Sequence, residues 1–279
     1  MEKISIAYSY CPNDTFIFDA MVHHKIDTEG LTFEVIMGDV EDLNNLAFKN
    51  TADVTKLSFH AFGHLTHNYI LLNSGSALGR GCGPLLITRP EMMDKIDQIN
   101  NWLIGIPGKN TTANFLLGLA FPNAKNKKSL VFSDIENELL EGKIDAGLII
   151  HENRFTYQQK GLVKIKDLGE FWEEQYALPI PLGGIAANRR LPLETIRKID
   201  RVLRKSIEFA FQNPNESKLY VQQHAQELSE EVCKKHIDLY VNDFSVDLGS
   251  EGIFAVETLM KKGQELGILE KLHLPLVVD

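Results

Sequence analysis

His151 is the residue whose type and position best suit acid–base chemistry in this sequence. It follows the apolar run Ile144–Ile150, which has the composition of a short buried strand. In a parallel α/β sheet the carboxyl ends of the strands face the ligand crevice. An imidazole placed there can accept a proton near neutral pH, so we predict that His151 is a general base. A histidine that only caps the strand end is an equally supported alternative at this point.

The residue after His151 is a carboxylate, but it is poorly placed to orient the imidazole. Adjacent side chains on an extended chain point to opposite faces. We therefore interpret Glu152 as a structural residue, with Arg154 as a candidate partner.

Two other pairs of polar residues stand where a ligand could be bound. Thr111 and Thr112 follow the loop Pro107–Asn110 at the expected start of a helix, where hydroxyls and backbone N–H groups can hold an anion. The alternative is a simple helix cap. Lys56 and Ser58 end a strand that matches the one before His151, and we predict that they contact the ligand opposite His151. The alternative is a solvated lysine beside a capping serine.

A glycine-rich loop and a histidine series are weaker candidates. The loop Ser74–Gly83 carries Arg80, which could bind a carboxylate, but it lacks the glycine spacing of a dinucleotide site. His60, His64 and His67 can share a helix face, yet no carboxylate accompanies them. We predict no metal site.

The elements that must position these residues alternate between strand and helix. The expected strands are 4–8, 31–37, 52–57, 69–73, 84–88, 103–106, 130–132 and 144–150. The expected helices are 16–23, 40–49, 59–66, 113–120, 135–141, 193–213, 216–225, 229–241 and 252–266. This alternation predicts an α/β fold built from parallel βαβ units.

The alternation occurs twice, so we predict two lobes. Lobe 1 comprises residues 1–88 and 181–279, including the C-terminal helices, and lobe 2 comprises residues 89–180. The apolar segments Leu85–Arg89 and Leu178–Asn188 would be the crossovers between them.

Composition excludes several classes of protein. The chain has 279 residues, 44% hydrophobic and 24% charged, with a net charge of −9. A general nucleic-acid binder needs a basic face, which this charge does not favour.

The sequence contains no apolar run long enough for a membrane helix, so we expect no membrane association. The first residues lack a basic and then apolar leader, which predicts a cytoplasmic protein. Three widely spaced cysteines make a disulfide framework unexpected.

Several long sequence blocks resemble one family, the 1,4-dihydroxy-6-naphthoate synthases of the futalosine route to menaquinone. The main blocks are Ser9–Ala20, Asp39–Asn44, Thr55–Ser58, Ser74–Leu85, Pro107–Leu117 and Gly147–Tyr157. The similarity continues through Leu178–Arg189, His224–Val232 and Tyr240–Gly252. Tyr10 departs from the family pattern, which commonly has a small residue or proline there.

The resemblance implies a fold, a reaction and a set of site residues. The fold would be that of type II periplasmic binding proteins, with a ligand cleft between two α/β lobes. The enzyme would be a lyase that converts cyclic dehypoxanthine futalosine to 1,4-dihydroxy-6-naphthoate and a dehypoxanthine futalosine sugar fragment, without a cofactor. His151 would be the proton acceptor. The implied substrate contacts are Lys56, Leu57, Ser58, Thr111 and Thr112, with Asn44 as a further candidate.

Two alternatives to this function remain open. One is chorismate dehydratase, a sister enzyme of the same pathway, and the other is a non-enzymatic solute-binding protein of the same fold. All three readings take a small molecule as partner. A homodimer is compatible with the sequence, but no feature establishes it.

Overall fold

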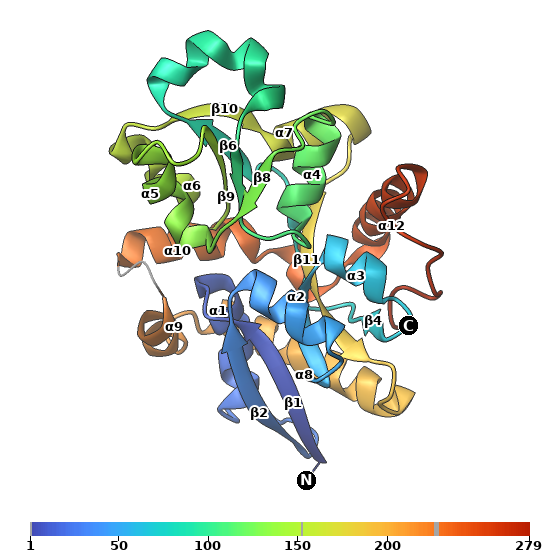
Figure 1. The fold of residues 1–279 in the computed structure, drawn as a ribbon. Coiled ribbons are helices and arrows are strands. Elements are labelled where there is room, and N and C mark those ends of the chain that lie inside the picture. The colour runs from blue at the N-terminus through green and yellow to red at the C-terminus, as the bar shows by residue number, and fades with distance from the viewer. Residues whose placement is uncertain (1, 152, 226–228) are drawn as a thin grey trace. The chain divides into compact units, whose positions relative to one another are not determined.

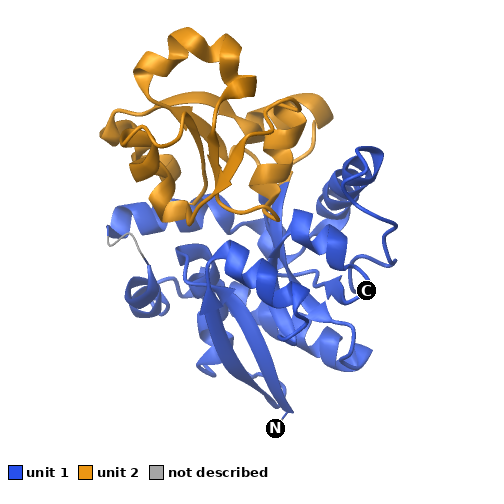
Figure 2. Ribbon diagram, in the orientation of Figure 1, with its two compact units in different colours: residues 1–79, 181–279 blue, residues 80–180 orange. Residues whose placement is uncertain are grey.

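The computed structural model describes residues 2–151, 153–225 and 229–279 (Figure 1). The chain divides into two compact units (Figure 2). Unit 1 comprises Met1–Gly79 and Pro181–Asp279, and unit 2 is the intervening segment Arg80–Ile180.

Unit 1 contains a mixed six-stranded sheet in the order β2-β1-β3-β11-β4, with β5 also paired to β11. Its strands are β1 (Glu2–Ser9), β2 (Leu31–Gly38), β3 (Val54–Ser58), β4 (Tyr69–Leu71), β5 (Ala77–Gly79) and β11 (Ile180–Asn188). β1 is parallel to β2 and β3, as the βαβ pattern predicts, whereas β11 is antiparallel to both β3 and β4.

Helices surround this sheet, and the longest one packs by a regular apolar stripe. The helices are α1 (Pro12–Val22), α2 (Val40–Phe48), α3 (Phe59–Leu65), α8 (Leu193–Gln212), α9 (Lys218–His224), α10 (Glu230–Tyr240), α11 (Asp243–Val246) and α12 (Gly249–Glu265). On α8 the side chains of Ile199, Val202, Leu203 and Ile207 are fully buried in the same core as the apolar residues of β1 and α1. These residues recur at helical spacing, and the helix expected over residues 193–213 is confirmed as α8.

Unit 2 contains a five-stranded sheet in the order β10-β6-β9-β7-β8. Its strands are β6 (Leu85–Thr88), β7 (Ile104–Ile106), β8 (Lys127–Ser129), β9 (Ala146–Ile149) and β10 (Val163–Asp167). Its helices are η1 (Pro90–Asn101), α4 (Thr112–Ala120), η2 (Phe132–Asp134), α5 (Ile135–Leu140), α6 (Asn153–Thr156), η3 (Tyr157–Lys160) and α7 (Leu168–Tyr176). β7 is parallel to β8 and β9, whereas β6 is antiparallel to β9 and β10.

The structure differs from the predicted elements and lobe boundary in several places. The strand expected at 130–132 is wrong, because the paired strand is β8 at residues 127–129 and η2 begins at Phe132, whose buried ring anchors the start of the helical segment. The elements that were not predicted are the strands β5, β10 and β11 and the helices η1, η2, α6, η3, α7 and α11. Residues 80–88 were assigned to lobe 1, but β6 pairs with β9 and β10 and so lies in the sheet of unit 2.

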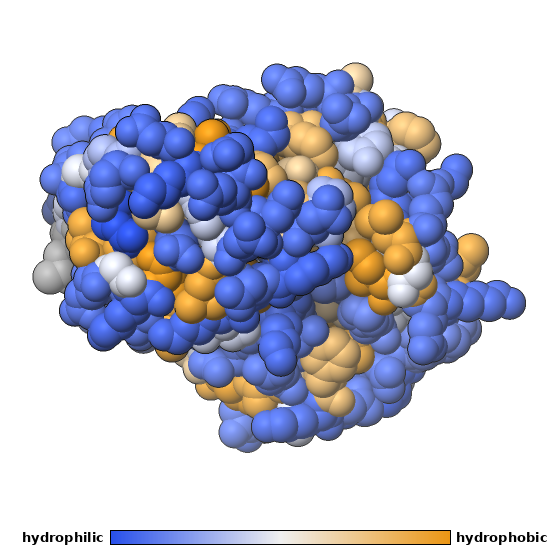
Figure 3. Space-filling model, turned by 45° about the horizontal axis from the view of Figure 1, so that its top comes forward, coloured by the Kyte–Doolittle hydropathy of each residue, from blue (hydrophilic) through white to orange (hydrophobic). Residues whose placement is uncertain are grey.

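The visible surface is largely hydrophilic, with hydrophobic residues in small groups (Figure 3). Within the described residues, no helix combines the length and the apolar character needed to cross a bilayer.

Candidate functional site

His151 follows the carboxyl end of β9, and its backbone has an unusual conformation. Its φ angle is 57°, in the left-handed region that few residues other than glycine adopt. This conformation costs roughly 1–2 kcal/mol for a residue with a Cβ atom. The imidazole meets the ring of Phe132 edge-on, with 5.0 Å between the ring centroids. Backbone outliers of this kind cluster at functional sites, where the surrounding structure must hold them in place.

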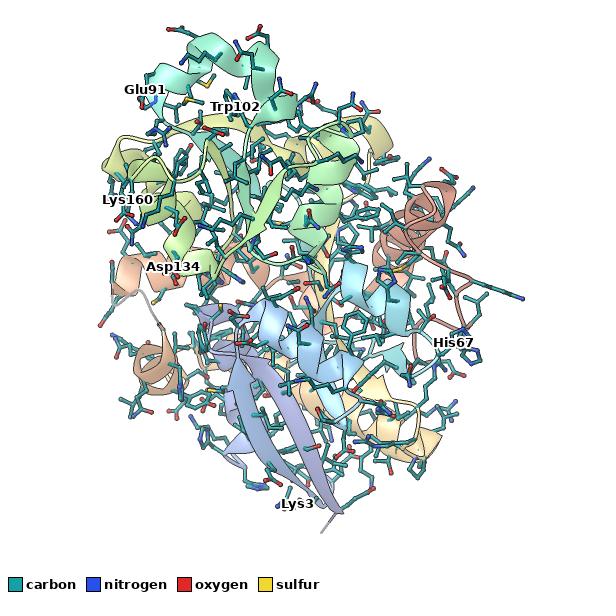
Figure 4. All side chains as sticks on the ribbon, in the orientation of Figure 1. Lys3, His67, Glu91, Trp102, Asp134 and Lys160 are labelled. Carbon is teal, nitrogen blue, oxygen red and sulfur yellow. The ribbon has the colours of Figure 1, made fainter. Side chains whose placement is uncertain are left out.

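A buried carboxylate fixes the chain on one side of His151. Asn153 Nδ2 donates to Glu136 Oε2 at 2.6 Å, and Lys160 Nζ donates to the same oxygen at 2.6 Å. Lys160 is labelled in Figure 4. Glu136 lies near the start of α5 and is fully buried, and its contact with Asn153 is buried as well, whereas the Lys160 side chain is 44% exposed. The helical turn after His151 is therefore tied to α5.

Arg154 fixes the same segment through a second set of contacts. Its guanidinium donates to Asp167 Oδ2 at 2.7 Å, to the carbonyl oxygen of Gly81 at 2.8 Å, and to that of Gly83. Asp167 in turn caps α7, because its Oδ1 accepts from the backbone N–H of Gly169 at 2.8 Å. Arg154 thus joins the segment after His151, the glycine-rich loop and α7. Its carboxylate partner is Asp167, whereas Glu152 lies outside the described residues.

The glycines of this loop have a packing role. A Cβ added to Gly83 would lie 2.2 Å from the backbone nitrogen of Gly169. The loop and the first turn of α7 approach each other so closely that only glycine fits. Arg80, in the second half of the loop, donates to the carbonyl oxygen of Ala177 at 3.4 Å, and its role in binding a carboxylate stays a prediction.

Thr111 and Thr112 start α4, as predicted, and both are buried. The Thr111 hydroxyl donates to the carbonyl oxygen of Gly108 at 2.9 Å and accepts from the backbone N–H of Asn114 at 3.2 Å. The bond from Asn114 makes Thr111 the N-cap of α4, while the bond to Gly108 fixes the hydroxyl against the preceding loop. The simple helix cap, which was the alternative to an anion site, is therefore present, and substrate contact by the pair stays a prediction.

Lys56 lies in β3 and is paired with a carboxylate that the sequence interpretation missed. Its Nζ donates to Asp14 Oδ1 at 2.8 Å, and the two side chains are 10% and 1% exposed. The alternative of a solvated lysine is therefore wrong. Asp14 lies inside α1, whose N-cap position is held by Cys11. Sequence reasoning missed this pair because the two residues are 42 positions apart and no local pattern connects them.

Ser58 and Asn44 are joined by two hydrogen bonds. The Ser58 backbone N–H donates to Asn44 Oδ1 at 3.0 Å, and Asn44 Nδ2 donates to Ser58 Oγ at 3.2 Å. Asn44 is fully buried on α2, and Leu57 is 1% exposed within β3. The side chain of Ser58 makes no capping bond to α3. The pair instead fixes the end of β3 against α2.

The predicted site residues are therefore distributed over both units. Lys56, Leu57, Ser58 and Asn44 come from unit 1, and His151, Thr111 and Thr112 come from unit 2. Among the described residues, no three His, Cys, Asp or Glu side chains are arranged to hold a metal ion.

Comparison with known proteins identifies the family. A family model described as menaquinone biosynthesis matches residues 4–265. The chain belongs to the menaquinone biosynthesis family. A relative from Thermus thermophilus named 1,4-dihydroxy-6-naphthoate synthase is 41% identical over 278 residues, covering 100% of both chains. A relative of the same name from Streptomyces coelicolor is 38% identical, covering 97% of this chain and 96% of its own.

Solved structures extend the comparison from the menaquinone biosynthesis family to its fold. A protein from Archaeoglobus fulgidus is 35% identical with a TM-score of 0.89, covering 96% of this chain and 98% of its own. A Candida albicans protein described as having the generic periplasmic binding protein fold is 14% identical with a TM-score of 0.72, covering 98% of this chain and 92% of its own. The fold is that of the periplasmic binding proteins, which confirms the predicted fold class.

Proposed function

We propose that this chain is a 1,4-dihydroxy-6-naphthoate synthase that acts on cyclic dehypoxanthine futalosine. Two relatives that carry this name match over nearly their full length. The proposal depends most on His151, which follows a buried strand in a left-handed backbone conformation and precedes a segment held by two sets of contacts. Such anchoring supports a side chain that must be positioned accurately for chemistry.

In the proposed mechanism His151 removes a proton from the carbon next to the ring carbonyl of the substrate. The electron pair left on that carbon moves into the ring and expels the sugar portion, which leaves with the bonding electrons and is then protonated. The ring becomes aromatic, and this change supplies much of the driving force. The protein must then provide a base, correct positioning and exclusion of water.

The remaining predicted residues would bind the substrate. Lys56 can donate from its ammonium, while Ser58 and Asn44 fix the end of β3 on which Lys56 lies. The hydroxyl of Thr111 already serves α4, so we expect the threonine pair to act through the helix start rather than through that hydroxyl.

Replacement of His151 tests the proposal. Asparagine is the best substitute, because it adopts the left-handed conformation more readily than alanine and cannot accept a proton near neutral pH. We expect His151→Asn to fold normally and to lose turnover of cyclic dehypoxanthine futalosine, followed by the absorbance of the naphthoate product. His67→Ala, an exposed histidine of unit 1, is the control.

The same assay separates the alternatives. Near-normal turnover by His151→Asn would show that His151 is not the base, although the proposed enzyme activity would still stand. Conversion of chorismate instead of the futalosine substrate would identify a dehydratase. Binding of either compound without conversion would indicate a solute-binding protein.

A further inference from the structure

A chain of buried hydrogen bonds links Lys56 to the C-terminal helices within unit 1. Lys56 Nζ donates to Asp14 Oδ1 at 2.8 Å, and Asn13 Nδ2 donates to the same oxygen at 2.8 Å. On its other side Asn13 Oδ1 lies 2.9 Å from Nε2 of His236 on α10. Because Asn13 uses its amide N–H on Asp14, its oxygen must accept, and so His236 Nε2 donates. The hydrogen bonds therefore converge on Asp14, which accepts from Asn13 on one side and from Lys56 on the other.

Asp14 is held from a third side as well. Its Oδ2 accepts from the backbone N–H of Ser9 at 3.1 Å and from Ser9 Oγ at 2.7 Å. Both oxygens of this buried carboxylate are thus used, and its position is fixed by β1, α1 and β3. A buried carboxylate satisfied in this way can keep its charge and orient a cation.

The Lys56 ammonium is only partly used by these contacts. An ammonium has three N–H bonds. Within the described residues, Lys56 Nζ makes one hydrogen bond, which is donated to Asp14 Oδ1. Lys56 therefore has donors available for a ligand, while its charge is balanced by a carboxylate at 2.8 Å.

We propose that Asp14 is a positioning residue that holds Lys56 and balances its charge, so that Lys56 binds an uncharged hydroxyl or carbonyl oxygen of the substrate. This inference rests on the proposed function of the chain. A carboxylate brought to Lys56 would lie close to Asp14, and two like charges repel strongly where water is excluded. An uncharged oxygen accepts the same hydrogen bonds without this repulsion. The substrate carboxylate must then be bound by other groups.

Substitution of Asp14 tests the positioning role. In Asp14→Asn we expect KM for cyclic dehypoxanthine futalosine to rise by about 10- to 100-fold, the range for loss of a charged hydrogen bond, with kcat nearly unchanged. Asp19→Asn is the matched control, since Asp19 is also a buried carboxylate of α1 and pairs with Lys25 at 2.6 Å. The control should lose stability without the change in KM. A normal KM in Asp14→Asn would overturn the inference.

A double variant separates positioning from structural support. Lys56→Met leaves the Asp14 carboxylate buried without its cation, and Asp14→Asn added to it removes that charge. The double variant should regain resistance to urea relative to Lys56→Met but keep the raised KM. Recovery of KM together with stability would show a purely structural pair and overturn the inference.

The kind of oxygen that Lys56 binds is tested with two ligands. We expect Lys56→Met to weaken binding of 1,4-dihydroxy-6-naphthoate and of its methyl ester by the same factor. Binding is measured by calorimetry under an atmosphere free of O2, which would oxidise the dihydroxy ring. Weakening for the acid alone would assign Lys56 to the carboxylate and overturn the inference. A wild-type protein that neither converts the futalosine substrate nor binds the product would overturn the proposed function itself. Normal wild-type turnover with unaffected Asp14 variants would overturn this inference alone.

Discussion

Replacing Arg154 with methionine should destabilise unit 2 strongly. The change keeps the apolar stem but removes the donors to Asp167 Oδ2 and to the carbonyl oxygens of Gly81 and Gly83. The side chains of Arg154 and Asp167 are 16% and 1% exposed, so water cannot easily replace the lost contacts. Breaking such a pair from one side typically costs about 3–5 kcal/mol.

The remaining contacts of Asp167 place the expected loss at the lower end of that range. Its Oδ1 still accepts from the backbone N–H groups of Gly169 and Glu170 at 2.8 and 3.2 Å. These bonds keep part of the carboxylate satisfied when Arg154 is removed. We therefore expect Arg154→Met to lower the free energy of unfolding by about 3 kcal/mol.

Tryptophan fluorescence in urea is a selective assay for this loss. Both tryptophans of the chain, Trp102 and Trp172, are buried in unit 2, so their emission follows the unfolding of that unit. Lys143→Met is the control, because Lys143 forms an exposed ion pair with Glu141 in the same unit and should show no measurable loss. The reasoning is refuted if Arg154→Met unfolds at the same urea concentration as Lys143→Met.

Three further predictions concern packing, thiol reactivity and pH. Gly83→Ala should lower the free energy of unfolding by about 3 kcal/mol or more, measured by urea unfolding, because the new Cβ would lie 2.2 Å from the backbone nitrogen of Gly169. Burial raises the pKa of the Cys82 thiol to about 12, so peptide mapping after iodoacetamide treatment at pH 8 should find Cys82 unlabelled until the protein is denatured. Hydrogen bonds from Arg201 hold the pKa of Glu29 at about 2, below its usual 4.5, so Glu29 stabilises the fold above pH 4.5 and loses this effect toward pH 2. Glu29→Gln should therefore unfold slightly more easily than the wild type at pH 7 and equally at pH 2.

Local patterns made much of this fold predictable. The helices expected over 193–213 and 40–49 depend on residues close in sequence. α8 buries an apolar stripe, and Asp39 caps α2 because its Oδ1 accepts from the backbone N–H groups of Glu41 and Asp42 at 2.9 and 2.8 Å. β11 was harder to predict, because its Gly183–Gly184 pair weakens the strand pattern. The pair is needed by packing that the sequence does not show, since a Cβ on Gly184 would lie 2.5 Å from a methyl group of Leu71.

The partners of the candidate site residues were the least predictable feature. Asp14 and Lys56 are 42 positions apart, and Arg154 reaches back 73 positions to Gly81. Residue type suggested Lys56 as a ligand contact and His151 as a base, and the strand pattern placed both at the ends of strands. Only the folded chain shows which carboxylate each segment uses, because that choice depends on how β1, β3 and α7 are packed.

The position of β11 in the sheet also affects how the chain can fold during synthesis. β11 lies between β3 and β4, yet it is translated after the whole of residues 80–180. A nascent chain that has emerged only through β4 cannot complete the sheet of unit 1, and one edge of β3 has no neighbouring strand. Unit 2 is continuous in sequence and can form first, since all of its strands are synthesised before β11 is complete. The unpaired edge of β3 is a surface to which another nascent chain could add a strand, so the ribosome-bound protein should depend on chaperones more than a protein with contiguous domains.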